Sequence, residues 1–262
     1  MPATLFGREA TGTYVLSEAQ LRKFTGRGAM HRFLEYLATG DACVIFDDFT
    51  TKALNTTNDY SVAAGATATT WAINGQANGV IRGATGTTAA TSGLHLLLNA
   101  TGMGTWTGAR SCGIEVMWQT SDITELRFEV GFGATFPAVN TVMVATNIGS
   151  GTPTFNTTAD GMVYLYNHTG STTTMGLFSI GTGITAQRVN NTIAAPVNAT
   201  FQRVSVQTNG QHGFVQVNGV TVARIATGIV AATAMYPIVA IKNNSTTSQN
   251  IDLDYIRIWQ NR

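Results

Sequence analysis

Charged residues are scarce in this chain of 262 residues. Asp, Glu, Lys and Arg make up 11% of it, and they nearly cancel to a formal net charge of +1. The usual charged share is about 25%. A chain with so little net charge has no global field to attract nucleic acid or an acidic partner. We therefore expect no nucleic-acid binding, and the abundant Thr, Asn and Gly favour strands and turns instead.

Cysteine is also scarce, with Cys43 and Cys112 as the whole supply. Two cysteines in a chain of this length do not make a disulfide framework. A bond between them stays open at this point. Free thiols that behave as small buried hydrophobes are the expected state.

Segments that would direct the chain to a membrane are not evident. The first residues, MPATLFGREATG, lack the apolar stretch of a signal peptide. No run of about 18 apolar residues is present. The sequence therefore predicts a chain that does not enter a membrane.

Familiar catalytic and cofactor motifs are missing too. The sequence has no Gly-x-Ser-x-Gly nucleophile motif and no Gly-x-Gly-x-x-Gly that leads from a strand into a helix. Its histidines, His31, His95, His168 and His212, are scattered without the spacing of metal ligands. These absences favour a protein without a resident cofactor.

What the sequence does contain, from Val44 onward, is the pattern of many short strands separated by Gly, Asn and Thr. Asn218-Gly219 predicts a tight hairpin between 214–217 and 220–224, because Asn-Gly is the favoured pair for a two-residue type I′ turn. Small-residue stretches at 63–70 and 84–93 are expected to be loops or weak edges. The expected strands are 44–49, 71–73, 79–82, 94–99, 113–119, 125–132, 141–147, 162–167, 175–180, 201–207, 213–217, 220–225, 237–242 and 251–259.

The last of these strands, 251–259, is strongly apolar. Because an exposed edge of this kind would promote aggregation, the strand needs a place inside a sheet that already exists. That requirement favours a sandwich or jelly roll that the C-terminal strand closes. Strict alternation places Ile251, Leu253, Tyr255 and Arg257 on one face and Asp252, Asp254, Ile256 and Ile258 on the other.

Two motifs in this region resemble a known family. Pro237-Ile-Val-Ala-Ile241, then a polar loop and Leu253-Asp-Tyr-Ile-Arg-Ile258, is similar to the closing strand pair of concanavalin A-like lectin and glucanase jelly rolls. Val44-Ile-Phe-Asp-Asp-Phe49 resembles the strand that opens many such domains. The resemblance covers roughly residues 43–262. It implies an all-β sandwich of two antiparallel sheets.

The resemblance also draws attention to Glu125-Leu-Arg-Phe-Glu129. Jelly-roll glucanases carry Glu-x-Asp-x-Glu on a strand of the cleft, with one Glu as nucleophile and the other as acid. Here Arg127 replaces the Asp, and an arginine works against the raised pKa that a general acid needs. We therefore expect a solvated ladder of Glu125, Arg127 and Glu129 on one strand face, no catalytic residue and no enzymatic activity. A degenerate or active hydrolase site is the alternative.

Three further residues are site candidates. Trp106 and Tyr60 could form a stacking surface for sugar rings, although packing in the core or an interface is the alternative for Trp106. Asp254 matches the Asp-Tyr strand near which some members of the family bind calcium, so the resemblance implies a structural calcium ion there. A surface aspartate is the alternative for Asp254.

Residues 1–42 differ from the rest and predict an arm of two short helices. Ser17-Glu-Ala-Gln20 is a capping box that begins the first helix. Two short helices cannot form a core alone, so the apolar stripe of the second needs a partner surface. We expect it to dock on sister copies or on another protein, with packing on its own β domain as the alternative. The stripe consists of Met30, Phe33, Leu34 and Leu37.

These features lead to a functional expectation. Uncharged β proteins rich in Thr, Gly and Ala are typical of phage fibres, spikes and shells. We expect a non-enzymatic structural protein of a phage virion, located in the virion as a decoration, fibre or spike component. Its partners would be other virion proteins, further copies of itself and host glycans. The alternatives are a carbohydrate-binding module that recognises host surface glycans and a glycoside hydrolase.

Overall fold

The structure of the protein is a computed structural model that describes most of the chain from Ala42 onward. The described residues are 7–8, 14–15, 42–50, 53–54, 56, 60–64, 70–74, 79–87, 93–98, 106–134, 145–147, 154–155, 160–170, 172–181, 184–190, 195–226, 229 and 231–261.

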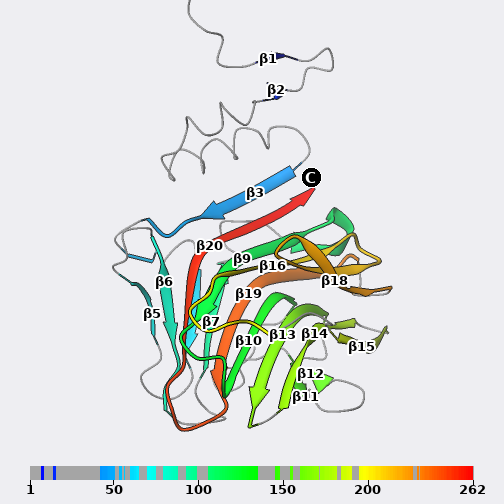
Figure 1. Ribbon diagram of the computed structural model, residues 1–262. Helices are drawn as coiled ribbons and strands as arrows, with labels where there is room; N and C mark the ends of the chain where they lie inside the picture. The colour runs from blue at the N-terminus through cyan, green and yellow to red at the C-terminus, as the bar shows by residue number, and fades with distance from the viewer. Residues whose placement is uncertain are drawn as a thin grey trace, which may run out of the picture.

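Two eight-stranded sheets form the fold (Figure 1). Sheet I contains β4 (Tyr60–Ala64), β7 (Gly93–Leu98), β8 (Trp106–Thr107), β10 (Leu126–Gly133), β13 (Gly161–Thr169), β14 (Thr172–Gly181), β15 (Ile184–Asn190) and β19 (Ala234–Asn243). Sheet II contains β3 (Ala42–Asp47), β5 (Thr70–Ile73), β6 (Ile81–Ala84), β9 (Gly113–Thr120), β16 (Gln202–Thr208), β17 (Gly213–Val217), β18 (Val220–Ile225) and β20 (Asn250–Asn261). Two short pairs lie outside these sheets, β1 (Gly7–Arg8) with β2 (Tyr14–Val15) and β11 (Ala145–Asn147) with β12 (Thr154–Phe155).

The strand order shows that the chain passes back and forth between the sheets. Sheet I has the order β15-β14-β13-β10-β19-β7-β4, with β8 beside β19. Sheet II has the order β18-β17-β16-β9-β20-β6-β5, with β3 paired to β20. Every strand pair is antiparallel. The expected all-β sandwich is therefore confirmed, and β20 closes sheet II between β9, β6 and β3.

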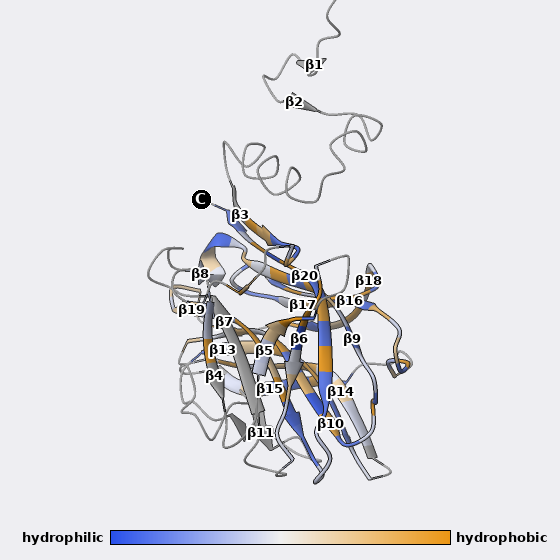
Figure 2. Ribbon diagram, turned by 90° about the vertical axis from the view of Figure 1, so that its left-hand side faces the viewer, coloured by the Kyte–Doolittle hydropathy of each residue, from blue (hydrophilic) through white to orange (hydrophobic). Residues whose placement is uncertain are grey.

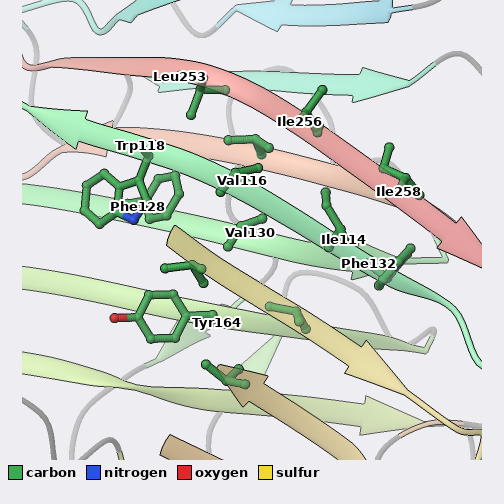
Figure 3. Close-up of a cluster of buried hydrophobic side chains, with 14 of the residues drawn as sticks. Ile114, Val116, Trp118, Phe128, Val130, Phe132, Tyr164, Leu253, Ile256 and Ile258 are labelled. Atoms are coloured by element: carbon green, nitrogen blue, oxygen red, sulfur yellow. The ribbon is translucent and has the colours of Figure 1, made fainter. Parts of the chain in front are cut away.

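Alternating side chains create the core between the sheets. On β9, Ile114, Val116 and Trp118 are buried, whereas Glu115 and Met117 on the other face are half-buried. Hydrophilic and hydrophobic positions alternate in the same way along other strands (Figure 2). Trp118 lies between the sheets and stacks on Phe128 of β10 with the ring centroids 4.1 Å apart (Figure 3). Burying large rings in this way supplies much of the apolar area that holds two sheets together.

The C-terminal strand departs from the expected alternation. A β-bulge shifts the register of β20 against β9 between Leu253 and Tyr255. As a result Ile251 and Leu253 before the bulge share the core face with Ile256 and Ile258 after it. The expectation that these two pairs lie on opposite faces is wrong, because one extra residue in a bulged strand reverses the facing of all that follow.

The predicted hairpin is confirmed. β17 and β18 pair on either side of Asn218 and Gly219, whose φ angles are +50° and +84°. β16 pairs with β17 on its other side. The sequence pattern did not predict β1, β2, β4, β8, β12 and β15, which are short or rich in small and polar residues.

The helical arm is not shown. Met30, Phe33, Leu34 and Leu37 lie outside the described residues, of which the arm contributes only β1 and β2. Where the structure describes the chain, its one helical element is a 3₁₀ turn at Gly108–Arg110. The boundary between arm and domain therefore stays a prediction. All strands of the two large sheets lie between Ala42 and Asn261.

Candidate functional site

The face of sheet I that points away from the core carries the residues with the most unusual environment. Register defines this face, because each core residue alternates with one that points outward. Arg127 on β10 pairs across the sheet with Lys242 on β19 and with Asn167 on β13, and Asn167 pairs in turn with Thr174 on β14. We call Lys242, Arg127, Asn167 and Thr174 the polar row. It crosses four adjacent strands, a span of about 14 Å at about 4.8 Å between neighbouring strands.

Arg127 and Glu129 form an ion pair next to this row. The Arg127 Nη2 donates to Glu129 Oε1 at 2.7 Å. The two residues are only 6% and 0% exposed. The expectation of a solvated ladder is therefore wrong, because both charges have been removed from water. Removing two charges from water costs several kcal/mol per ion, and good geometry offsets that cost only in part.

Glu125 does not belong to this arrangement. It precedes β10, has a φ of +54°, and its Oε1 accepts a hydrogen bond from the Gly170 amide at 2.5 Å. Its own amide donates to His168 Nδ1 at 3.4 Å. Glu125 thus ties the turn before β10 to the β13–β14 hairpin. The expected alignment of Glu125 with Glu129 on one strand face is wrong, since the left-handed turn residue leaves the pleat before the strand begins.

Burial makes the charged forms of Arg127 and Lys242 unfavourable in the polar row. Burial lowers the pKa of Arg127 from its ordinary value, and Glu129 opposes that change. Burial likewise lowers the pKa of Lys242, and the neighbouring Arg127 charge lowers it further, while Glu129 raises it. Perturbed groups of this kind are concentrated at functional sites, although structural ion pairs show them too. Here a single carboxylate faces two cations.

The number of acids on this face limits the chemistry it can perform. Glu129 is the only Asp or Glu on the described strands of sheet I. Glycoside hydrolysis by the usual route needs two carboxyl groups on either side of the scissile bond. The Glu129 carboxylate accepts a hydrogen bond from Arg127 through Oε1. The described strands thus provide hydrogen-bond donors and one carboxylate.

Neither aromatic candidate offers an exposed ring. Trp106 and Tyr60 are each 2% exposed and belong to the core between the sheets. Tyr60 also donates its hydroxyl to Asp47 Oδ2 at 2.5 Å. The suggestion that they form a stacking surface for sugars is withdrawn, because rings packed on all sides cannot receive a ligand. Trp106 lies between Gly104 and Gly108 in the sequence and belongs to β8, which pairs with β19.

The expected calcium ligand, Asp254, belongs to no cluster of metal ligands in the described part of the chain. Asp254 is half-buried at the bulge of β20. Within the described residues no group of three or more His, Cys, Asp or Glu side chains could hold a metal ion. Calcium takes six to eight oxygen ligands, so one carboxylate is too few. The described residues do not supply the site that the resemblance implies.

Cys112 is a free, fully buried thiol. Burial raises its pKa to about 12, so the thiolate is not formed at neutral pH. The side chain of Cys43 lies outside the described residues. In the described part of the chain, no helix is both long and apolar enough to span a bilayer.

Sequence reasoning missed Lys242, Asn167 and Thr174. Lys242 had one local signal, a single cation directly after the apolar run 237–241. Nothing in the sequence placed it beside Arg127, because the pairing of β10 with β19 joins distant segments. Sheet register, and not any local motif, assembles the polar row.

Comparison with known proteins gives structural neighbours only. No protein-family model and no curated protein matches the chain. Among solved structures, the catalytic domain of an endo-1,3-β-glucanase (laminarinase) from Thermotoga petrophila is similar with a TM-score of 0.58 and 11% identity, over 85% of this chain and 99% of that one. The Emp47p carbohydrate recognition domain gives 0.55 and 11%, over 85% and 98%. A Bacillus licheniformis β-glucanase gives 0.53 and 13%, over 86% and 100%.

These neighbours correct one prediction. Most of them are polysaccharide-cleaving enzymes, which also include a κ-carrageenase. A further neighbour, LamA from Z. galactanivorans, was solved in complex with laminaritriose and laminaritetraose. The expectation that the chain is not an enzyme is therefore contradicted, although identities this low show the fold alone. Neither the virion setting nor the partners of the arm is addressed by the comparison. The chain has the concanavalin A-like jelly-roll fold that lectins and glucanases share.

Proposed function

We propose that this protein binds a polysaccharide chain along the polar row of sheet I. The observation that carries the proposal is the Arg127–Glu129 ion pair on the outward face, with its two residues 6% and 0% exposed. A buried pair of charges is often less stable than apolar side chains of similar volume, so its contribution to folding does not account for it. Fixed charges and amides on a rigid sheet do suit the orientation of a polar ligand.

The neighbouring residues support the same proposal. Asn167 is held by Asn244, whose Nδ2 donates to Asn167 Oδ1 at 2.9 Å and to the His168 carbonyl at 2.9 Å. Thr174 on the next strand is half-buried. Side chains that are pre-positioned in this way lose little freedom when a ligand binds. Carbohydrate-binding and carbohydrate-cleaving neighbours with this fold add weaker support.

Binding can be tested with two matched substitutions. Thr174→Ala removes a hydroxyl from the polar row, and Thr221→Ala removes one from an exposed position on β18 of sheet II. On a glycan array, the wild type and Thr221→Ala should bind the same glycans, and Thr174→Ala should bind them several-fold more weakly. Equal binding by all three proteins, or no binding by any, would refute the proposal. Melting temperatures of the variants provide the folding control.

Glycoside hydrolysis is the second candidate, and the polysaccharide-cleaving neighbours with this fold favour it. Glu129 would act as the nucleophile or base, with its Oε1 held by Arg127. Release of reducing sugar from laminarin, lichenan and κ-carrageenan tests the activity of the wild type. Activity that is lost in Glu129→Gln and Glu129→Asp, both confirmed as folded by circular dichroism, would assign the role to Glu129.

The virion setting is a proposal about where such binding takes place. Its support is the composition, which is low in charge and rich in Thr, Gly and Asn. Antibody labelling of purified particles tests it directly. Labelled particles would favour attachment to host glycans, and unlabelled particles would remove the support for a virion role.

A further inference from the structure

Two cations lie side by side in the polar row without enough negative charge between them. Arg127 and Lys242 are direct cross-strand partners on the same face, a position in which the Cβ atoms are about 4.5–5.5 Å apart. Like charges directly opposite each other destabilise a sheet. Glu129 bonds to Arg127 through one guanidinium nitrogen, Nη2. No ion pair joins Lys242 to a carboxylate of the described chain.

Arg127 also has a hydrogen-bond donor that lacks an acceptor. Its Nε is buried and has no hydrogen-bond partner. A buried donor without an acceptor costs about 1–3 kcal/mol, and more when it is charged. An oxyanion placed between Arg127 Nε and Lys242 Nζ would satisfy both groups, since guanidinium and ammonium donors bind carboxylate and sulfate oxygens well.

The described strands of sheet I also carry more positive than negative charge. Its described strands carry three full cations, Arg127, Arg188 and Lys242, and the single carboxylate of Glu129. Arg188 is engaged elsewhere, because its Nε donates to Asn190 Oδ1 at 2.6 Å and its guanidinium lies 5.4 Å from the Phe178 ring centroid. The unmatched positive charge is therefore centred on Arg127 and Lys242.

We propose that Arg127 and Lys242 form a subsite for an oxyanion on the glycan, a sulfate ester or a uronate carboxylate. The inference rests on the proposed function and narrows it to acidic polysaccharides. Lys242, which is half-buried, would meet the anion at the surface. Arg127, which is 6% exposed, would bind the same anion from beneath the surface. Neutral glycans would lack the group that this pair recognises.

Calorimetric titration of the full chain at low salt tests the subsite with four probes. They are κ-carrageenan tetrasaccharide as the sulfated probe, tetragalacturonate as the carboxylated probe, laminaritetraose as the neutral probe, and sodium sulfate as the free anion. We expect at least one acidic oligosaccharide to bind about tenfold more tightly than laminaritetraose, which corresponds to about 1.4 kcal/mol. That advantage should shrink as salt is added, because salt screens the attraction.

Two charge-neutralising variants locate the effect. Lys242→Gln should weaken binding of the acidic probe about tenfold and leave laminaritetraose unchanged, and Lys242→Arg should restore most of the loss. Arg224→Gln, at an exposed position on β18 of sheet II, removes the same charge and should change neither. Lys242 is not fully buried, so these proteins should fold, as melting temperatures will verify.

The outcomes separate the two proposals. Equal affinities for acidic and neutral probes, or an acidic preference that survives Lys242→Gln, would overturn the oxyanion subsite while leaving glycan binding intact. Binding of sodium sulfate that Lys242→Gln abolishes, with no oligosaccharide bound, would overturn the proposed function and support the anion site itself. No binding of any probe would overturn both.

Discussion

Arg127 and Glu129 place two charges on a strand whose eight residues are all buried. At the scale of single residues, this pair distinguishes sheet I from an ordinary apolar sheet. Removing one partner of a buried ion pair is strongly destabilising, whereas replacing both partners with apolar side chains is often neutral or stabilising. The fold should therefore tolerate the loss of both charges better than the loss of one.

Glu129→Gln should lower the free energy of unfolding by about 3–5 kcal/mol, because it leaves the Arg127 charge buried and unpaired. The double variant Arg127→Met/Glu129→Leu should recover most of that loss, since no buried charge remains. Urea denaturation of the wild type and variants measures both effects. A double variant no more stable than Glu129→Gln would mean that the pair is needed for the fold itself.

Lys242 should be a source of instability that depends on pH. Its folded-state pKa is lowered from the ordinary 10.5, chiefly by burial and then by the Arg127 charge. Between the lowered value and 10.5 the unfolded chain binds more protons, so the stability of the wild type rises with pH across that window. Below the window the penalty of the buried charge is fully present, and above 10.5 it is gone.

Lys242→Met should therefore be more stable than the wild type at pH 7, by up to about 1 kcal/mol after allowance for solvent screening. The difference should fade as the pH approaches 10.5 and disappear above it. Thermal unfolding from pH 7 to pH 11 provides the measurement. A difference that stays constant over this range would show that it arises from packing and not from charge.

At the scale of elements, the bulge in β20 decides which half of the strand faces the core. Deleting Asp254 would remove the extra residue and turn either Ile251 and Leu253, or Ile256 and Ile258, away from the core. We expect the deletion to prevent stable folding. Asp254→Ala keeps the strand length and should melt close to the wild type, as circular dichroism can show. A deletion variant that melts like the wild type would contradict the assigned register.

The way strands pair also explains which features could be predicted from the sequence and which could not. Strand alternation and the Asn218-Gly219 turn depend on neighbours in the chain, so the sandwich, the hairpin and the buried Trp118 were predictable. The bulge was not, because only the pairing with β9 reveals it. The polar row was not either, since Arg127 and Lys242 meet through the pairing of distant strands. Glu125 and Glu129 looked equivalent in the sequence, and a left-handed turn residue separated them.

At the scale of the whole molecule, every strand of the two large sheets begins at or after Ala42. Deleting residues 1–41 should therefore leave a soluble domain with a nearly unchanged melting temperature. Deleting residues 1–49 should lower the melting temperature strongly, because it also removes β3 and uncovers an edge of β20. If the shorter deletion already causes aggregation, the arm contributes to the core, and its expected role in docking loses its support.

The proposed function places a glycan along the polar row on the outer face of sheet I. Backbone amide NMR of the labelled protein, titrated separately with laminaritetraose and tetragalacturonate, tests that location most directly. We expect shifts centred on Arg127, Asn167, Thr174 and Lys242, larger with tetragalacturonate, and no shifts at Phe214 and Gln216 on the outer face of sheet II. Shifts confined to sheet II, or no shifts with either sugar at millimolar concentration, would contradict it.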